Sequence, residues 1–173
     1  MTCYLTNTVL CAEINENEPL GSIPNLEVRL LDGSTTTLEE LYSSGPLLID
    51  FWATWCIPCK KLMKYLNEYH QKYLDRGFKV LMINTDTPRS IGKVKSYIRS
   101  QGFQFSVALD PNKVLSKKLN GIVMPTTILV SDKGKIIWRH QGFNLGEETL
   151  IQSKIESILM KKNVMEKMQA DET

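Results

Sequence analysis

The chain has 173 residues, of which 42% are hydrophobic and 23% charged, and its formal net charge is +2. This size and apolar content suit one domain with a sizeable core that needs no help from metals or many disulfides. A net charge this close to zero gives no strong electrostatic reason to expect binding to nucleic acid or to a membrane surface. No apolar run reaches the roughly 18 residues of a membrane-spanning helix, so we expect no integral membrane segment.

The first 22 residues are expected to form a flexible leader. They lack a basic region followed by an apolar stretch of about 7–15 residues, so we expect no complete signal peptide here. Residues 9–12 before the acidic residues 13–18 fit either the stub of a removed export signal or an ordinary disordered leader. Two of the four cysteines, Cys3 and Cys11, lie here; they could pair, stay free or be removed, and we assign them no function.

From Ile23 the hydrophobic pattern becomes regular. In chain order it predicts strands over residues 26–31 and 34–36, a short helix over 37–42, a strand over 47–53, a helix over 60–76, a strand over 78–84, a helix over 88–101, a short strand over 105–109, a helix after 111, a hairpin of strands 126–130 and 135–142, and a last helix over 146–160. Residues 161–173 form a charged tail that we expect to fray. The domain therefore covers residues 23–160.

Capping residues mark the expected helix starts. Thr37 precedes the first helix, and Thr87–Pro88 and Asp110–Pro111 each place a capping side chain before a proline of the first turn. Spacings of three and four residues mark the faces that should be buried. For the two helices after residue 111, the expected core residues are Val114, Leu115, Leu119, Leu150, Ile151, Ile155, Ile158 and Leu159.

Alternating strands and helices that end in a hairpin and a helix predict an α/β fold. The sheet should be central and mixed, with parallel strands joined by crossovers and antiparallel strands added by the hairpin. The strand over residues 47–53 is apolar on both faces, as an inner strand should be. Helices should flank the sheet on both sides.

The pair Cys56 and Cys59 lies where this inner strand is followed by a helix. Two thiols separated by two residues can close into a disulfide if the chain turns as the first turn of a helix does. Free N–H groups and the positive end of the helix dipole favour a thiolate at Cys56. The arrangement suits thiol–disulfide exchange. The alternatives are two structural thiols or half of a zinc site, but zinc would need ligands from Cys3, Cys11, His70 and His140, which show no recognisable spacing.

Residues 50–60 and 123–127, Asp-Phe-Trp-Ala-Thr-Trp-Cys-Ile-Pro-Cys-Lys and Val-Met-Pro-Thr-Thr, resemble the thioredoxin superfamily. The early hairpin, the Phe-Trp-Ala-Thr-Trp-Cys run and a strand–helix insert near residues 88–111 are similar to its TlpA/ResA branch of bacterial thiol:disulfide interchange proteins. The resemblance implies a thioredoxin fold with an N-terminal β-hairpin extension and that insert. It covers residues 23–160.

The resemblance also implies roles for individual residues. Cys56 attacks a substrate disulfide and Cys59 resolves the mixed disulfide. Burying the Asp50 carboxylate costs free energy, which favours a functional role, and the resemblance implies that it accepts the proton of Cys59. The alternative is a partly solvated, hydrogen-bonded aspartate with no such role. Pro125 matches a cis-proline that faces the dithiol and presents the Met124 backbone to the substrate, and it keeps metal off the thiols. The alternative is that Pro125 has no role in the site and is an ordinary proline at the start of a strand.

Three further residues belong to the expected substrate-binding set. Trp55 borders Cys56. Ile57 and Pro58 influence the stability of the disulfide and so the reduction potential of the pair. Trp52 is expected in the core. Asp86 approximates a site acid of the TlpA/ResA branch, although a role at a helix start explains it equally well.

The sequence thus predicts an enzyme, a thiol:disulfide oxidoreductase that reduces protein disulfides through Cys56 and Cys59. We expect no metal and no cofactor beyond this redox-active disulfide. The partners would be protein disulfide substrates and an upstream dithiol electron donor, and the chain would be a monomer. The branch favours a periplasmic or otherwise extracytoplasmic location, with the cytoplasm as the alternative.

Two other functions stay open from the sequence. A thiol-dependent peroxidase would share the fold, but it places a threonine three residues before its cysteine, where this chain has Ala53. A non-catalytic thioredoxin-like binding module usually loses a cysteine, and this chain keeps both.

Overall fold

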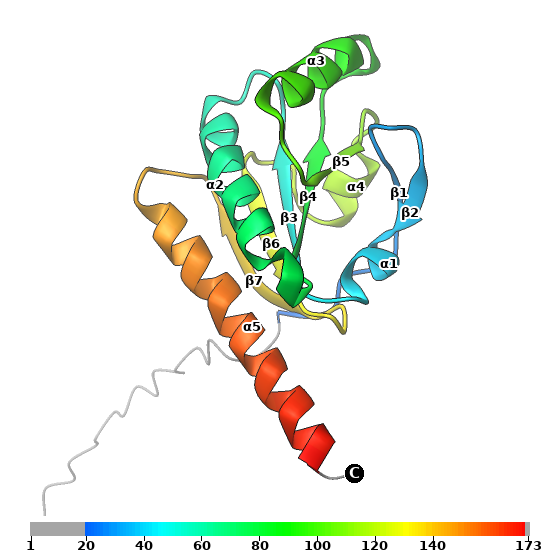
Figure 1. Cartoon of the computed structure of the whole chain (residues 1–173). Helices are drawn as coiled ribbons and strands as arrows, with labels where there is room; N and C mark the ends of the chain where they lie inside the picture. Colours follow the sequence, from blue (N-terminus) through cyan, green and yellow to red (C-terminus); the bar gives the residue numbers. More distant parts are fainter. Residues whose placement is uncertain (1–19, 172–173) are drawn as a thin grey trace, which may run out of the picture.

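The computed structural model describes residues 20–171, with side chains up to residue 164. At its centre is a five-stranded sheet in the order β5-β4-β3-β6-β7 (Figure 1). The strands are β3 (Leu47–Trp52), β4 (Lys79–Asn84), β5 (Ser106–Leu109), β6 (Thr126–Val130) and β7 (Ile136–Gln141). The strands β3, β4 and β5 are parallel, whereas β6 and β7 are each antiparallel to their neighbours. The predicted mixed α/β sheet is confirmed.

Helices lie on both sides of this sheet. They are α2 (Ile57–Tyr73), which continues into the 3₁₀ turn η1 (Leu74–Arg76), then η2 (Pro88–Ser90), α3 (Ile91–Gln101), α4 (Val114–Lys118) and α5 (Glu147–Asp171). The long helices α2 and α5 run along one face, and α4 lies behind the sheet (Figure 1). No helix among the described residues is both long and apolar enough to cross a membrane.

Alternation along β3 divides the buried residues into two cores. Leu48 and Trp52 pack with α2, α3 and α5 on one face, whereas Leu47, Ile49 and Phe51 pack on the other face with α1 and α4. All six residues of β3 are buried, as the sequence predicts for an inner strand. The carboxyl end of β3 therefore emerges from the middle of the molecule and leads directly to the two cysteines.

The early segment folds as the expected hairpin, β1 (Glu27–Arg29) and β2 (Thr35–Thr37), followed by α1 (Leu38–Tyr42). Thr37 and Glu40 form a reciprocal capping box at the start of α1, which confirms the predicted cap. The Leu31 N–H donates to the Val107 carbonyl at 2.8 Å, so the hairpin attaches to the edge strand β5. This contact covers part of an otherwise open sheet edge.

Other capping expectations are corrected. Thr87 precedes η2 but its side chain makes no capping hydrogen bond, because the chain enters through a 3₁₀ turn before α3 begins. α4 begins at Val114, later than the Asp110–Pro111 pair suggests. The Asp110 carboxylate nevertheless reaches forward to the N–H groups of Leu115 and Ser116, at 3.1 and 2.8 Å, so it still serves that helix start.

Two expected core residues are exposed. Val114 and Leu150, each in the first turn of its helix, are 51% and 42% exposed. The other candidates in these helices, including Ile151, Ile155 and Leu159, are buried as predicted.

Hydrogen-bonded structure continues beyond residues 23–160 at both ends. The last helix continues to Asp171, through most of the segment expected to fray. Residues 20–22 lie beside the start of β7, where the Leu20 N–H donates to the Ile136 carbonyl at 2.8 Å. The rest of the expected leader, with Cys3 and Cys11, falls outside the described residues.

Candidate active site

The two cysteines occupy the turn between β3 and the first turn of α2. Cys56 is the N-cap of α2, and Pro58 lies in the first turn, where a missing N–H leaves no bond unmade. The Cys56 N–H donates to the Ala53 carbonyl at 3.0 Å and closes the turn. Cys56 and Cys59 form a disulfide with Cα atoms 5.3 Å apart. The sequence therefore places the dithiol at the helix start, as predicted.

The two sulfurs differ in environment. Cys56 is 4% exposed and Cys59 is fully buried, so Cys56 is the residue with some access to solvent. The Cys59 N–H donates to the Cys56 sulfur at 3.3 Å, in the position of an N-cap contact. The same N–H, together with the helix dipole, would stabilise a Cys56 thiolate after reduction. Beside Cys56, Trp55 and Ile57 are each 69% exposed.

Asp50 lies beneath the dithiol turn on β3. Its side chain shares the sheet face of Leu48 and Trp52, the face that packs against α2 and includes Cys59. One carboxyl oxygen accepts a hydrogen bond from the Thr127 hydroxyl at 2.7 Å, and the other has no partner among the described residues. Burial raises the pKa of Asp50 to about 8, and the bond from Thr127 opposes this rise. Asp50 is therefore poised to exchange a proton near neutral pH.

The loop before β6 forms the other side of the site. The Met124–Pro125 peptide bond is cis. Phe51 on β3 is paired with Thr126 on β6, so the residues before Thr126 lie beside the chain that leaves β3 toward Cys56. The Thr85 hydroxyl also donates to the Met124 sulfur at 3.2 Å. The structure thus brings Met124 and Pro125 to the dithiol turn, although they lie far along the chain.

With this geometry in place, comparison with known proteins is informative. The family model described as Redoxin matches residues 19–159. The chain belongs to the Redoxin family. It is 31% identical to the thiol-disulfide oxidoreductase ResA of Bacillus thuringiensis subsp. konkukian, over 72% of this chain and 70% of that protein.

Solved structures agree with this membership. A Chlorobium tepidum protein described as a candidate thiol:disulfide interchange protein DsbE superposes with a TM-score of 0.75 and 26% identity, covering 82% of this chain and 98% of that one. A thioredoxin-like protein of Porphyromonas gingivalis gives a TM-score of 0.69 and 26% identity, over 80% and 92% of the two chains. The resemblance to ResA-like members of the thioredoxin superfamily and the thioredoxin fold are both confirmed.

The structure adds two residues to the site of this Redoxin-family chain that sequence reasoning missed. Thr127 is the antiparallel partner of Asp50, and Thr54 binds the buried carboxylate of Asp86. The capping role considered for Asp86 is wrong, because its oxygens accept from Thr54 and Asn84. Nothing local in the sequence signals the Thr127–Asp50 and Thr54–Asp86 contacts, because each joins residues from different strands or loops.

The histidines lie outside this site. His70 is buried on α2, and His140 on β7 stacks on Trp138 and lies 3.4 Å from Glu147. Within residues 20–164, whose side chains the structure describes, no three His, Cys, Asp or Glu side chains gather as a metal site would require.

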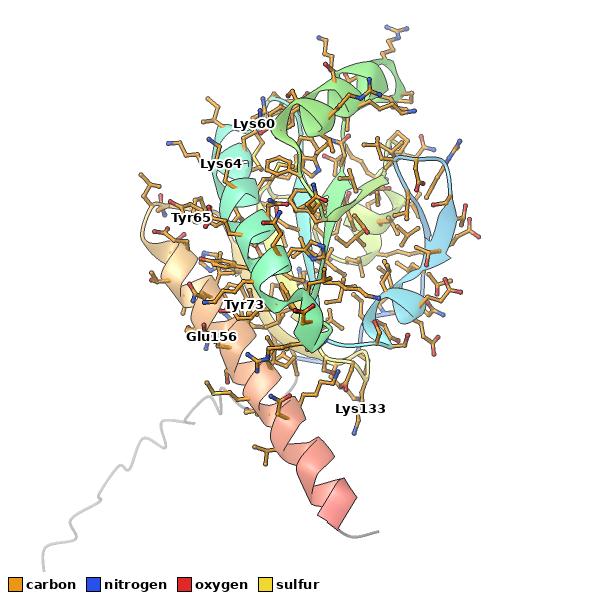
Figure 2. All side chains as sticks on the ribbon, viewed as in Figure 1. Lys60, Lys64, Tyr65, Tyr73, Lys133 and Glu156 are labelled. Atoms are coloured by element: carbon orange, nitrogen blue, oxygen red, sulfur yellow. A yellow bond between two sulfur atoms is a disulfide. The ribbon has the colours of Figure 1, made fainter. Side chains whose placement is uncertain are left out.

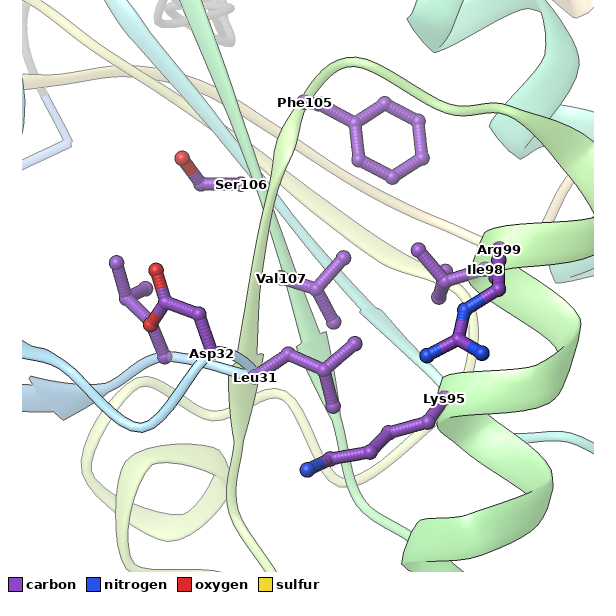
Figure 3. Close-up of a pocket in the computed structure, with 9 residues that line it drawn as sticks. Leu31, Asp32, Lys95, Ile98, Arg99, Phe105, Ser106 and Val107 are labelled. Carbon is purple, nitrogen blue, oxygen red and sulfur yellow. The ribbon is translucent and has the colours of Figure 1, made fainter.

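A separate groove of about 500 Å³ lies between α3, β5 and the tip of the early hairpin. Figure 3 shows Lys95 and Arg99 of α3 facing Leu31 and Asp32 across Val107. Neither Cys56 nor Cys59 lines this groove.

Proposed function

We propose that this chain reduces the disulfides of partner proteins with Cys56 as the attacking sulfur and Cys59 as the resolving sulfur. A thiol:disulfide oxidoreductase activity agrees with the Redoxin family and with ResA relatives of that name. The observation that carries the assignment of roles is the difference between the sulfurs. Cys56 caps a helix close to the surface, and Cys59 lies fully buried one turn later.

The first step joins the enzyme to its substrate. The reduced Cys56 thiolate attacks one sulfur of a substrate disulfide, and a bond forms between these two sulfurs while the substrate S–S bond breaks. The departing substrate thiolate takes a proton from solvent. The helix N-terminus lowers the cost of keeping Cys56 ionised before the attack.

The second step releases the substrate. The Cys59 thiol gives its proton to the Asp50 carboxylate, and its sulfur attacks Cys56, so that the Cys56–Cys59 bond forms and the second substrate thiolate leaves. Two electrons have then passed from the enzyme to the substrate. Asp50 suits this transfer because its pKa of about 8 is close to that of a thiol.

The surface around Cys56 suits a polypeptide substrate. Trp55 and Ile57 offer exposed apolar side chains on one side, and Met124 and Pro125 border the turn on the other. Pro58 constrains the turn between the cysteines and so contributes to the redox poise.

The remaining proposals rest on the family resemblance. A dithiol electron donor would reduce the Cys56–Cys59 bond after each cycle, and this pair would be the only redox group, with no metal or other cofactor. We further propose that the chain works as a monomer in the periplasm or another extracytoplasmic compartment, with the cytoplasm as the alternative. The domain would comprise residues 23–160, with the charged segment 161–173 outside it.

Trapping tests the assignment of roles. A Cys59→Ser variant should accumulate mixed disulfides with substrate proteins, because resolution is blocked while attack by Cys56 continues. Non-reducing electrophoresis and mass spectrometry would display these species, and dithiothreitol should dissolve them. Wild-type protein should reduce insulin disulfides. The Cys56→Ser variant should neither reduce insulin nor form mixed disulfides with substrate proteins.

Trapping by Cys56→Ser instead would reverse the two roles. A wild-type protein that is folded and reduced yet leaves insulin untouched would contradict the proposed function. Rapid thiol-dependent consumption of hydrogen peroxide by the wild type would favour the peroxidase alternative.

A further inference from the structure

Asp86 binds the turn that carries Cys56. One of its carboxylate oxygens accepts the Thr54 N–H at 2.8 Å, and the other accepts the Thr54 hydroxyl at 3.1 Å. Thr54 lies two residues before Cys56. Asp86 is only 7% exposed, so these bonds are shielded from competing water.

A second contact holds Asp86 itself in place. The Asn84 side-chain amide donates to the Asp86 carboxylate at 2.9 Å, and the Asp86 N–H donates back to the Asn84 side-chain oxygen at 3.2 Å. The Thr54 N–H, the Thr54 hydroxyl and the Asn84 amide thus all donate hydrogen bonds to the Asp86 carboxylate. Asn84 is the last residue of β4, so the carboxylate is anchored to the central sheet.

The residue between them reaches the opposite side of the site. The Thr85 N–H donates to the Trp52 carbonyl at 3.0 Å, at the end of β3, and the Thr85 hydroxyl donates to the Met124 sulfur at 3.2 Å. Residues 84–86 therefore touch both the dithiol turn and the loop that contains the cis peptide bond. These two parts of the site come from distant segments of the chain.

We propose that Asp86 is a positioning residue for the dithiol, which holds the Thr54–Cys56 turn in register with the Met124–Pro125 loop. This inference rests on the proposed disulfide exchange and names a residue outside the reacting pair. Attack on a protein disulfide needs the Cys56 sulfur and the substrate-binding loop aligned together, and a misplacement of about 1 Å can cost about a hundredfold in rate. A small alkylating reagent needs only the thiolate.

The test compares Asp86→Ala with wild type in two reactions. For insulin reduction we expect kcat/KM to fall about ten- to a hundredfold. For iodoacetamide at a pH where Cys56 is fully ionised, we expect the alkylation rate to change less than about twofold, because the thiolate itself is untouched. Asp86→Asn, which keeps an oxygen for the Thr54 N–H, should recover insulin reduction to within about threefold of wild type.

Asp110 provides a matched control. Like Asp86, it is a buried acid just after a sheet strand that accepts backbone hydrogen bonds, but its donors are the N–H groups of Leu115 and Ser116 in α4. Asp110→Ala should lower the melting temperature to a similar degree and leave kcat/KM for insulin within about twofold of wild type. Should Asp86→Ala not fold, Thr54→Val removes the hydroxyl bond alone and should still lower kcat/KM while alkylation is unchanged.

Three results would overturn the proposal while wild type still reduces insulin. The first is an Asp86→Ala protein, or a Thr54→Val protein in its place, with kcat/KM unchanged. The second is an equal loss for Asp110→Ala, which would point to general destabilisation. The third is an equal loss in alkylation, which would mean that Asp86 acts on the thiol and not on alignment. A wild type that cannot reduce insulin would instead contradict the proposed function.

Discussion

At the scale of single residues, Asp50 shows how burial sets chemistry. A carboxyl surrounded by apolar side chains loses the water that would stabilise its charge, so its pKa rises to about 8. The Thr127 hydroxyl binds one oxygen and leaves the other without a partner in the described part of the chain. A carboxyl that gives up its proton only near pH 8 suits proton exchange with a thiol of similar pKa, and it also makes the free energy of unfolding depend on pH.

We predict that Asp50→Asn is more stable than wild type at neutral pH. In the unfolded chain Asp50 ionises near its ordinary value of 3.8, whereas in the folded protein it stays protonated up to about pH 8. The stability that protonated Asp50 contributes should therefore be fully present below about pH 4 and be lost as the pH rises toward 8, at about 1.4 kcal/mol per pH unit and up to about 6 kcal/mol in all. Asparagine has no such dependence and can still accept the Thr127 bond.

Urea denaturation of the oxidised proteins at pH 4 and pH 7.5 checks this. The free energy of unfolding of Asp50→Asn should exceed that of wild type at pH 7.5, and the difference should nearly vanish at pH 4. Equal pH profiles for the two proteins would show that Asp50 is ionised in the fold.

At the scale of elements, α5 is held by one face only. Its buried residues pack with α2, and polar contacts add to this packing where the Tyr69 hydroxyl donates to the Glu148 carbonyl at 3.0 Å. Farther along, the Tyr73 hydroxyl of α2 donates to the Glu156 carboxylate of α5 (Figure 2). Leu150 directly precedes Ile151 and so points away from the face that Ile151, Ile155 and Leu159 share, which leaves it 42% exposed.

The two leucines of α5 should therefore respond differently to truncation. Leu159→Ala removes a fully buried side chain and should cost about 2–4 kcal/mol in the free energy of unfolding. Leu150→Ala, at 42% exposure, should cost less than about 0.5 kcal/mol. Chemical denaturation of both variants gives the comparison, and similar losses would mean that Leu150 is covered in solution.

At the scale of the whole molecule, the fold ties the redox state to stability. The sheet separates two cores. Cys56 and Cys59 follow the carboxyl end of β3, the middle strand of the sheet, and lie in the core that includes α2. Any preference of the folded protein for the disulfide over the dithiol must appear both in the reduction potential and in the free energy of unfolding, because the two are linked. A strong oxidant such as DsbA gains its potential from a stabilised reduced form.

If this protein is a reductase, its oxidised form should be the more stable of the two. The oxidised form should unfold at a higher temperature than the reduced form, by about 2–4 °C for each kcal/mol of preference. Calorimetry with and without dithiothreitol measures this, and a Cys56→Ser/Cys59→Ser double variant should show no shift and so controls for the other cysteines. A reduced form that melts higher would place the protein among the oxidants.

Much of this architecture follows from local sequence. The order of strands and helices, the early hairpin with its Thr37 cap, and the position of Cys56 at a helix start all depend on periodicity, capping and turn chemistry within a few residues. The helix boundaries near Val114 and Asp171 were less predictable, because tertiary packing decides where a helix turns away from the sheet or continues past it.

The tertiary structure alone decided which polar groups meet beneath the dithiol. Thr127 reaches Asp50 across 77 residues of sequence, and Thr54 reaches Asp86 across 32. The sequence determined that two cysteines lie at the start of α2, and strand pairing determined which residues surround them. Local patterns carry no record of register, whereas register places one side chain against another and so sets the burial and hydrogen bonding on which the proposed proton transfer and alignment depend.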